Sequence, residues 1–509
     1  MLDLTLPFRT YARIRSGKLA MQDPIAIQRQ QLHRLLAKAK DTRFGHAHRF
    51  AHIHSVEEYQ DRVRIRRYED FWREYWQPDF PRLDNCTWPG TIPYFALTSG
   101  TTSGVTKYIP VSPQMLVSNR IAGLDIVTHH YTARPGSTLM RGLCFMLGGS
   151  TALNQLAPRI WGGDLSGIAG KTVPWWARLR YFPPCELETI ADWEEKIARF
   201  GPASLATDIR AIGGVPSWLL LFFDKLAELR PNCERRLAGI YPDLEMLVHG
   251  GVNFAPYRSQ FARWLEGSRA ETREIYPASE GCIAVADRGN GDGLRLITDT
   301  GIFYEFVPLE ELDSPNPTRH WVETLEPGVN YAVVLTTCAG LWSYVIGDTV
   351  RFVDRNPPRL LVTGRTSYFL SAFGEHLIGE EIERAVAEAA ARVNVSVTDY
   401  SVGAVFPESV SEVGGHLFIV EFVERIIEDA QLRQFATAID AVLCRINEDY
   451  NAHRARGFGM QAPQVHAVPA DTFAAWMKSR GRLGGQNKVP RVISDASLFA
   501  SLRAFTGCA

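Results

Sequence analysis

The stretch Thr98-Ser99-Gly100-Thr101-Thr102-Ser103-Gly104-Val105-Thr106-Lys107 separates two short runs of strand-forming residues, 92–97 and 108–111. The glycines allow the backbone to turn so sharply that successive N–H groups can face one anion. The hydroxyl groups and the Lys107 ammonium add further donors and a positive charge. This chemistry predicts a loop that binds a polyphosphate. An ordinary polar loop between two strands has the same composition, so the stretch alone leaves both interpretations open.

The composition fits a globular enzyme of several domain-sized units. Lys and Arg number 55 against 56 Asp and Glu, and the net charge of −1 creates no field that would attract nucleic acid or an anionic membrane. The eight cysteines are scattered without a CxxC pair, which suits a reducing compartment. The N-terminus lacks the features of a signal peptide, and the longest apolar run, 218–223, is far shorter than the roughly 20 residues of a spanning helix. We expect a cytoplasmic protein that binds neither nucleic acid nor a membrane.

Three further predicted strands are followed by residues suited to a nucleotide. The run 244–251 ends in Gly250-Gly251, which would let a flat base approach the backbone, and Tyr276 in the run 274–280, a strand that ends in a turn, could stack on that base. Ser279 could meet a phosphate, and Glu280 is a hard oxygen ligand suited to magnesium; an exposed loop glutamate is the alternative. Asp348, placed by its pattern at the end of the apolar run 341–347, could accept the hydroxyls of a ribose.

The remaining pattern predicts helices in the large part of the chain and a smaller α+β part after Arg365. The run 113–133 reads as a helix, and Pro216 opens a second, apolar helix that could wall an acyl pocket through Trp218 and Phe222 or simply belong to the core. Beyond Arg365 we expect helices at 379–393, 429–449 and 473–478, strands at 395–405, 416–422 and 464–468, and a polar loop that delivers Lys488.

The order of these features resembles the adenylate-forming superfamily of acyl ligases and luciferases. Within it, the chain is similar to the Gretchen Hagen family of acyl-acid amido synthetases in its bacterial form, because Ser103 lengthens the glycine loop by one residue. Five further segments carry the resemblance: 42–45, 68–70, 214–218, 276–280 and 488–491. Where the superfamily's hinge usually has an acidic residue and a following lysine, this chain has Tyr368 and Ser371.

The resemblance implies a mixed α/β and α+β fold. A large N-terminal domain of β-sheets flanked by helices, residues 1–365, would bind ATP and the acyl group, and a small mobile C-terminal α+β domain, 366–509, would close over it. The implied reaction joins a carboxylic acid to ATP with release of pyrophosphate and then passes the acyl group to an amine, typically an amino acid. ATP and Mg²⁺ are the implied cofactors, and the partners are two small molecules.

The resemblance also assigns roles to residues. Lys488, Lys107 and Glu280 would be catalytic, with Glu280 as the magnesium ligand. The implied ATP and AMP site comprises Ser99, Gly100, Thr101, Thr102, Ser103, Gly104, Gly250, Gly251, Tyr276, Pro277, Ala278, Ser279, Asp348 and Arg365. Two alternatives stay open: a ligase with a thiol acceptor (coenzyme A or a carrier protein), and a catalytically silent nucleotide-binding scaffold.

Overall fold

The computed structural model divides the chain into two compact units. Unit 1 contains Met1–Val252 and Leu265–Val362, and unit 2 contains Asn253–Trp264 and Thr363–Ala509. The structure describes residues 3–99, 106–148, 152–188, 190, 193–251, 254, 257–289, 291–366, 369–370, 377–405, 414–423, 428–447, 450–451, 454, 460–482, 488–493 and 495–508.

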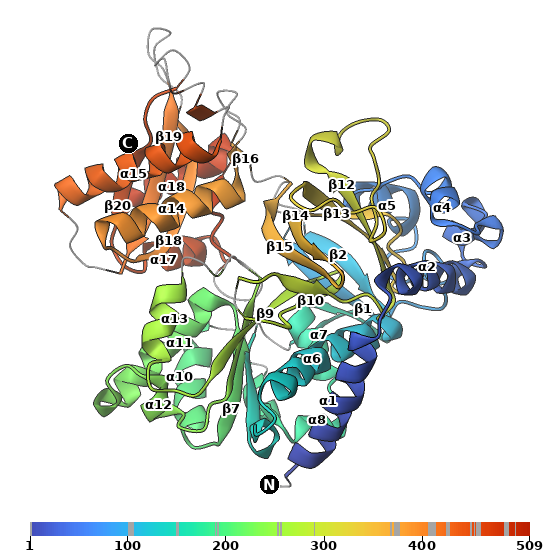
Figure 1. The fold of residues 1–509 in the computed structure, drawn as a ribbon, viewed down its shortest axis with the longest axis horizontal. Coiled ribbons are helices and arrows are strands. Elements are labelled where there is room, and N and C mark those ends of the chain that lie inside the picture. The colour runs from blue at the N-terminus through green and yellow to red at the C-terminus, as the bar shows by residue number, and fades with distance from the viewer. Residues whose placement is uncertain are drawn as a thin grey trace. The chain divides into compact units, whose positions relative to one another are not determined.

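A mixed sheet runs through unit 1 (Figure 1). In spatial order its strands are β12 (Ile302–Pro308), β13 (Asn330–Thr337), β14 (Tyr344–Arg355), β15 (Pro358–Arg365), β11 (Leu294–Leu296), β10 (Gly281–Val285), β9 (Glu271–Ala278), β8 (Met246–Gly250), β7 (Ile209–Gly214), β3 (Leu143–Leu147) and β6 (Tyr181–Phe182). The strands from β9 to β6 are parallel, whereas β10, β11, β13, β14 and β12 join antiparallel neighbours. The carboxyl ends of the parallel strands therefore lie at one edge of the sheet.

A second, four-stranded sheet carries the predicted phosphate loop. Its order is β2 (Thr106–Val111), β1 (Tyr94–Ser99), β5 (Ile160–Gly163) and β4 (Asn154–Ala157). Strands β1 and β2 pair antiparallel, with Thr98 opposite Lys107 and Ser99 opposite Thr106. The predicted strand–loop–strand arrangement is thus confirmed for its two flanks, while residues 100–105 lie outside the described part of the chain.

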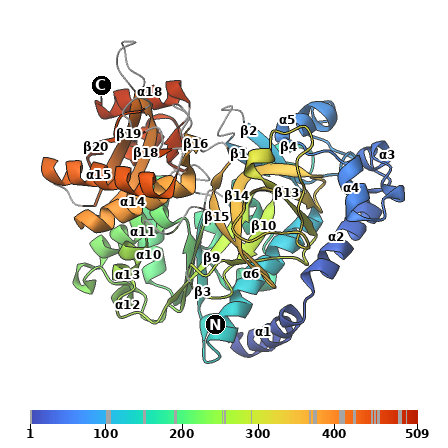
Figure 2. The ribbon, with the colours of Figure 1, turned by 45° about the horizontal axis from the view of Figure 1, so that its top comes forward.

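Helices cover both faces of the parallel strands (Figures 1 and 2). On one face α1 (Thr5–Ala20) and α6 (Pro113–Ala133) pack against inward residues of β7 and β8 such as Ala211 and Met246. On the other, α10 (Trp193–Leu205) and α11 (Pro216–Leu229) cover an aromatic cluster of β3, β6 and both helices. Alternate residues of a strand point to opposite faces, so these strands must be apolar on both.

Unit 1 contains further helices besides these four. They are α2 (Pro24–Ala39), α3 (Arg43–Ala47), α4 (Val56–Arg62), α5 (Tyr68–Phe71), α7 (Leu165–Lys171), α8 (Trp175–Arg178), α9 (Cys185–Glu188) and α12 (Leu237–Ile240). No helix within the described ranges is both long and apolar enough to cross a membrane.

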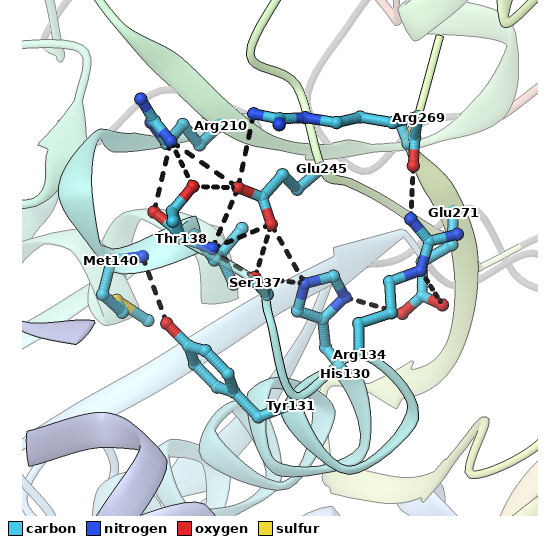
Figure 3. A network of polar contacts seen from close by, with 12 residues as sticks. His130, Tyr131, Arg134, Ser137, Thr138, Met140, Arg210, Glu245, Arg269 and Glu271 are labelled. Carbon is cyan, nitrogen blue, oxygen red and sulfur yellow. Dashed lines mark hydrogen bonds and ion pairs between the residues drawn. The ribbon is translucent and has the colours of Figure 1, made fainter. Parts of the chain in front are cut away.

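A buried ionic network pins the end of α6 to the amino ends of β8 and β9 (Figure 3). His130 lies in the last turn of α6; its Nδ1 donates to Glu271 at 2.7 Å and its Nε2 donates to the Ser137 hydroxyl at 2.8 Å, which in turn donates to Glu245. Burial disfavours an imidazolium here, but the two carboxylates outweigh it and raise the pKa of His130. The positive ring also suits the carboxyl end of a helix.

Unit 2 is a small α+β body with one addition from elsewhere in the chain. Its sheet has the order β20 (Gln464–Val468), β19 (Gly415–Phe422), β18 (Val397–Val405) and β21 (Val492–Ile493), and a short pair joins β16 (Phe369–Leu370) to β17 (Leu377–Ile378). Its helices are α14 (Gly379–Val393), α15 (Asp429–Ile446), α17 (Thr472–Ser479) and α18 (Ala496–Thr506). The addition is α13 (Arg258–Trp264), which the sequence places between β8 and β9 but whose contacts belong to unit 2.

Candidate active site

The carboxyl ends of β7, β8 and β9 form one wall of the candidate site. The register pairs Gly214 with His249 and Gly250 with Ile275, so β7 and β8 end at nearly the same level, whereas β9 continues beyond them to Ala278. Gly250 has no room for a side chain, because a Cβ there would lie 2.1 Å from the Ile275 carbonyl oxygen. Gly251 has φ +83°, which favours glycine. Close packing of β8 on β9 thus accounts for Gly250, and the backbone turn accounts for Gly251.

Two predicted nucleotide residues meet directly. The Tyr276 hydroxyl donates a 2.8 Å hydrogen bond to the Asp348 carboxylate, and Tyr276 is only 5% exposed. The sequence placed Asp348 at a strand end, but β14 continues through it to Arg355. The pairing with β13 shifts register between Ala332 and Val334, and Gly347 has φ +87°. Asp348 therefore lies in a bulge, an irregularity that can re-aim a side chain out of the ladder.

The segment 276–280 contains the end of β9 and the tight turn between β9 and β10. Ala278 pairs with Gly281, which leaves Ser279 and Glu280 as the two turn residues, each 8% exposed. Tyr276, Pro277 and Ala278 are the last three residues of β9. The turn is therefore held on both sides by the sheet, and Glu280 is fixed in place without being fully buried.

Lys107 and Glu280 share a cluster of residues that the sequence did not single out as functional. Lys107 Nζ lies 3.5 Å from Glu69 Oε1 and 5.3 Å from the centre of the Tyr68 ring. Tyr344 is fully buried, and burial first, then the negative charges of Glu280 and Glu69, raise its pKa well above the usual value. In the sequence, this cluster was indicated only by segment 68–70, one of the segments that carry the family resemblance. Glu69 gives Lys107 an anionic partner that a bound phosphate could replace.

Glu280 is the predicted magnesium ligand. Within the described ranges no three His, Cys, Asp or Glu side chains gather into a site that could hold a metal alone. Glu280 lies at the carboxyl edge, in a turn fixed by β9 and β10. Because magnesium is commonly held by one or two carboxylates together with substrate phosphates, Glu280 fits such an ion.

The other predicted site residues are less informative. Residues 100–104 of the loop and the hinge positions Tyr368 and Ser371 lie outside the described residues. Trp218 and Phe222 are 8% and 0% exposed on α11, and the Phe222 ring lies 5.1 Å from Phe145 in the aromatic cluster. That contact explains Phe222 as core; its predicted place in an acyl pocket stays a prediction.

Unit 2 holds the two remaining basic residues, Lys488 and Arg365. Arg365 is the last residue of β15, and Lys488 is exposed. Directly behind Lys488 the chain is anchored: the Pro490 carbonyl accepts from Ser401 at 2.8 Å, and Arg491 donates to Tyr257 at 2.8 Å and to Glu383 at 3.1 Å. Lys488 is therefore an exposed ammonium on a rigid base.

The fold is that of the adenylate-forming ligases. An acyl acid amido synthetase, GH3.15, superposes with a TM-score of 0.79 over 97% of this chain and 95% of its own, at 16% identity. A 2-hydroxyisobutyryl-CoA ligase superposes with a TM-score of 0.62 over 95% of this chain and 92% of its own, at 17% identity. At such identities the likeness establishes the fold alone.

The chain belongs to the GH3 family. Models of the family's N-terminal, central and C-terminal domains match residues 13–155, 295–365 and 380–497, together well over half of the chain. Among curated relatives, the indole-3-acetic acid-amido synthetase GH3.8 of Oryza sativa subsp. indica is 27% identical over 212 residues, and the 4-substituted benzoates-glutamate ligase GH3.12 of Arabidopsis thaliana is 24% identical over 205. Each match covers 38% of this chain and about a third of the relative, 33% and 35%. The resemblance seen in the sequence is thereby confirmed.

Proposed function

We propose that the protein is an ATP-dependent acyl-acid amido synthetase. It would convert a carboxylic acid to an acyl-adenylate with release of pyrophosphate and then transfer the acyl group to an amine, most simply an amino acid. The observation that carries the proposal is the Tyr276–Asp348 hydrogen bond at the carboxyl edge of the sheet. A carboxylate that a buried phenol holds in place near a strand end can accept the hydroxyls of a ribose. Membership of the GH3 family supports the adenylation step.

Each residue of the proposed site would have a separate role in the first step. Asp348 would accept the ribose hydroxyls, and Tyr276 would hold Asp348 in place. Lys107 would leave Glu69 for a phosphate, and the backbone of residues 99–104 would cradle the departing pyrophosphate. Glu280 would hold a magnesium ion, which would supply neutralisation of the phosphate charge. Because two anions must meet, most of the catalysis would come from positioning and charge neutralisation.

Lys488 and Arg365 would complete the site from unit 2. The Lys488 ammonium would bridge the acid's carboxylate and the α-phosphate, which suits a compact charge on a rigid base. The C-terminal domain of our proposed division, residues 366–509, would act as the lid that excludes water from the adenylate and then readmits the amine.

The experiment is acid-dependent exchange of pyrophosphate into ATP, followed by mass analysis of the products. Exchange with an acid panel and a product mass equal to acid plus amine minus water would support the proposal. A thioester formed with coenzyme A, and no amide, would identify the thiol-acceptor alternative instead. Nucleotide binding without exchange for any acid would identify the silent scaffold.

A further inference from the structure

Lys196 is a buried ammonium with few partners. It lies on α10 and is 2% exposed, and its Nζ donates to the Gly148 carbonyl at 3.2 Å. An ammonium carries three donors, and the described residues offer Lys196 Nζ no second hydrogen-bond acceptor. Burying a charge with so little compensation costs stability unless something else supplies a partner. Burial accordingly lowers the pKa of Lys196 to about 8.

Two more polar side chains gather around Gly148. Ser166 Oγ is buried and finds no hydrogen-bond partner within the described ranges, and a Cβ built on Gly148 would lie only 3.4 Å from it. Asp164, directly before α7, attracts Lys196 electrostatically, and its own pKa is raised by burial. The cluster thus offers a donor in Lys196, an acceptor in Asp164 and a hydroxyl in Ser166 that can do either.

The cluster lies at the same sheet edge as the nucleotide residues. Gly148 follows the last residue of β3, and the register leads from Leu147 to Gly214, then to His249, then to Glu274. With strands about 4.8 Å apart, three spacings place it about 14 Å from Tyr276 along this edge. That is the separation expected between a nucleoside and the far end of a small acyl group.

We propose that Lys196, Asp164 and Ser166 form the distal end of the acid pocket and bind a hydroxyl group on the acid. This inference rests on the proposed function. A hydroxyl can accept from Lys196 and donate to Asp164 at once, whereas a second carboxylate would be repelled by Asp164 and a methyl group would offer neither residue a hydrogen bond. The acid substrates would therefore be hydroxylated carboxylic acids.

Paired acids test this. We would measure kcat/KM for pyrophosphate exchange with benzoate against 4-hydroxybenzoate and with phenylacetate against 4-hydroxyphenylacetate. The wild-type enzyme should prefer the hydroxylated member of a pair by at least about tenfold, because a site built to bind a hydroxyl rejects analogues without it. Lys196→Met and Ser166→Ala should each reduce that ratio several-fold. Lys225→Met, on the exposed face of α11, is the matched control and should leave it unchanged.

A ratio, unlike a rate, does not respond to a purely structural brace. If Lys196→Met lowers exchange equally for both members of a pair, or if the wild-type enzyme shows no preference, the hydroxyl site is wrong while the synthetase proposal stands. A rise in the KM for the amine alone would assign the cluster to the acceptor and would equally overturn it. If none of the acids supports pyrophosphate exchange, both the proposed function and this inference are wrong. Should Lys196→Met fail to fold, the nearly isosteric Ser166→Ala decides.

Discussion

At the scale of single residues, replacing Lys488 is the most direct test of the proposed first step. Its exposed ammonium stands on a segment fixed by Ser401 and Arg491, so removal of the side chain should disturb chemistry more than folding. We expect Lys488→Ala to lower acid-dependent pyrophosphate release by about 100-fold or more, the size of effect typical for one charge that stabilises a transition state. ATP binding, measured by calorimetry, should change little.

Lys478→Ala is the control for this variant, because it removes another exposed lysine from unit 2 at the end of α17. Both variants should melt at the wild-type temperature. Normal pyrophosphate release from Lys488→Ala would remove this residue from the mechanism.

The Tyr276 hydroxyl predicts an indirect effect on nucleotide affinity. Tyr276→Phe keeps the ring and deletes the hydrogen bond to Asp348, so the carboxylate should lose its fixed orientation. A loss near 1 kcal/mol, or about fivefold in the ATP dissociation constant, is expected. Asp348→Ala should cost more, and the double variant should be no weaker than Asp348→Ala alone, since the hydroxyl acts only through the carboxylate.

Tyr241→Phe provides the comparison, because it removes another buried phenol, one that is hydrogen-bonded to Ser204 at 2.6 Å. It should lower stability without altering the affinity for ATP. Additive losses in the Tyr276 and Asp348 double variant would show that the phenol contacts the nucleotide independently.

At the scale of elements, the His130 network makes the docking of α6 on β8 and β9 depend on pH. The raised pKa of His130 means that its contribution is complete below the ordinary value of 6.5 and disappears as the pH rises through the raised value. Burial opposes the charge of Glu271, but His130 and Arg273 lower its pKa to about 2, so its contribution is complete above the ordinary 4.5 and is lost as the pH falls toward 2. The network is therefore strongest between about pH 4.5 and 6.5.

His130→Gln should destabilise the protein by about 2 kcal/mol at pH 5.5, because it removes one cation from the carboxylates of Glu245 and Glu271, which keep only their arginine partners. The deficit relative to wild type, read from urea unfolding, should shrink as the pH rises past the raised pKa of His130. His33→Gln replaces an exposed histidine and serves as control. A deficit that is the same at pH 5.5 and 9 would mean that His130 is neutral in the folded protein.

Local patterns predicted whole elements but not how they meet. The predicted helices 113–133 and 379–393 and the strand 464–468 match α6, α14 and β20 residue for residue, because capping residues and apolar periodicity are encoded in the local sequence. Asp348 was misplaced relative to its strand, since the bulge exists only through the pairing of β14 with β13. The Lys196 cluster was missed for the same reason: its members come from two separate segments, 164–166 and α10.

At the scale of the whole molecule, α13 belongs to a different unit from the segments that flank it in the sequence. It follows β8 of unit 1 in the chain, yet it belongs to unit 2, where Gln260 donates to the Val397 carbonyl and Tyr257 accepts from Arg491. Tyr257 is 2% exposed, and the Arg491 guanidinium lies 5.3 Å from its ring. A boundary drawn at 365 from the sequence alone would leave this segment with the wrong body.

Tyr257→Ala should therefore destabilise unit 2 although it lies between two strands of unit 1. The variant creates a cavity and leaves the buried Arg491 with fewer partners, for an expected loss of about 3 kcal/mol. Hydrogen exchange followed by mass spectrometry should show faster exchange in β18 and β21, with β8 and β9 unchanged. Tyr257→Phe, which keeps the ring under Arg491 and loses only the hydroxyl, should show a smaller effect in the same strands. Faster exchange confined to β8 and β9 would place α13 with unit 1, and the segment would then have no means of moving with the proposed lid.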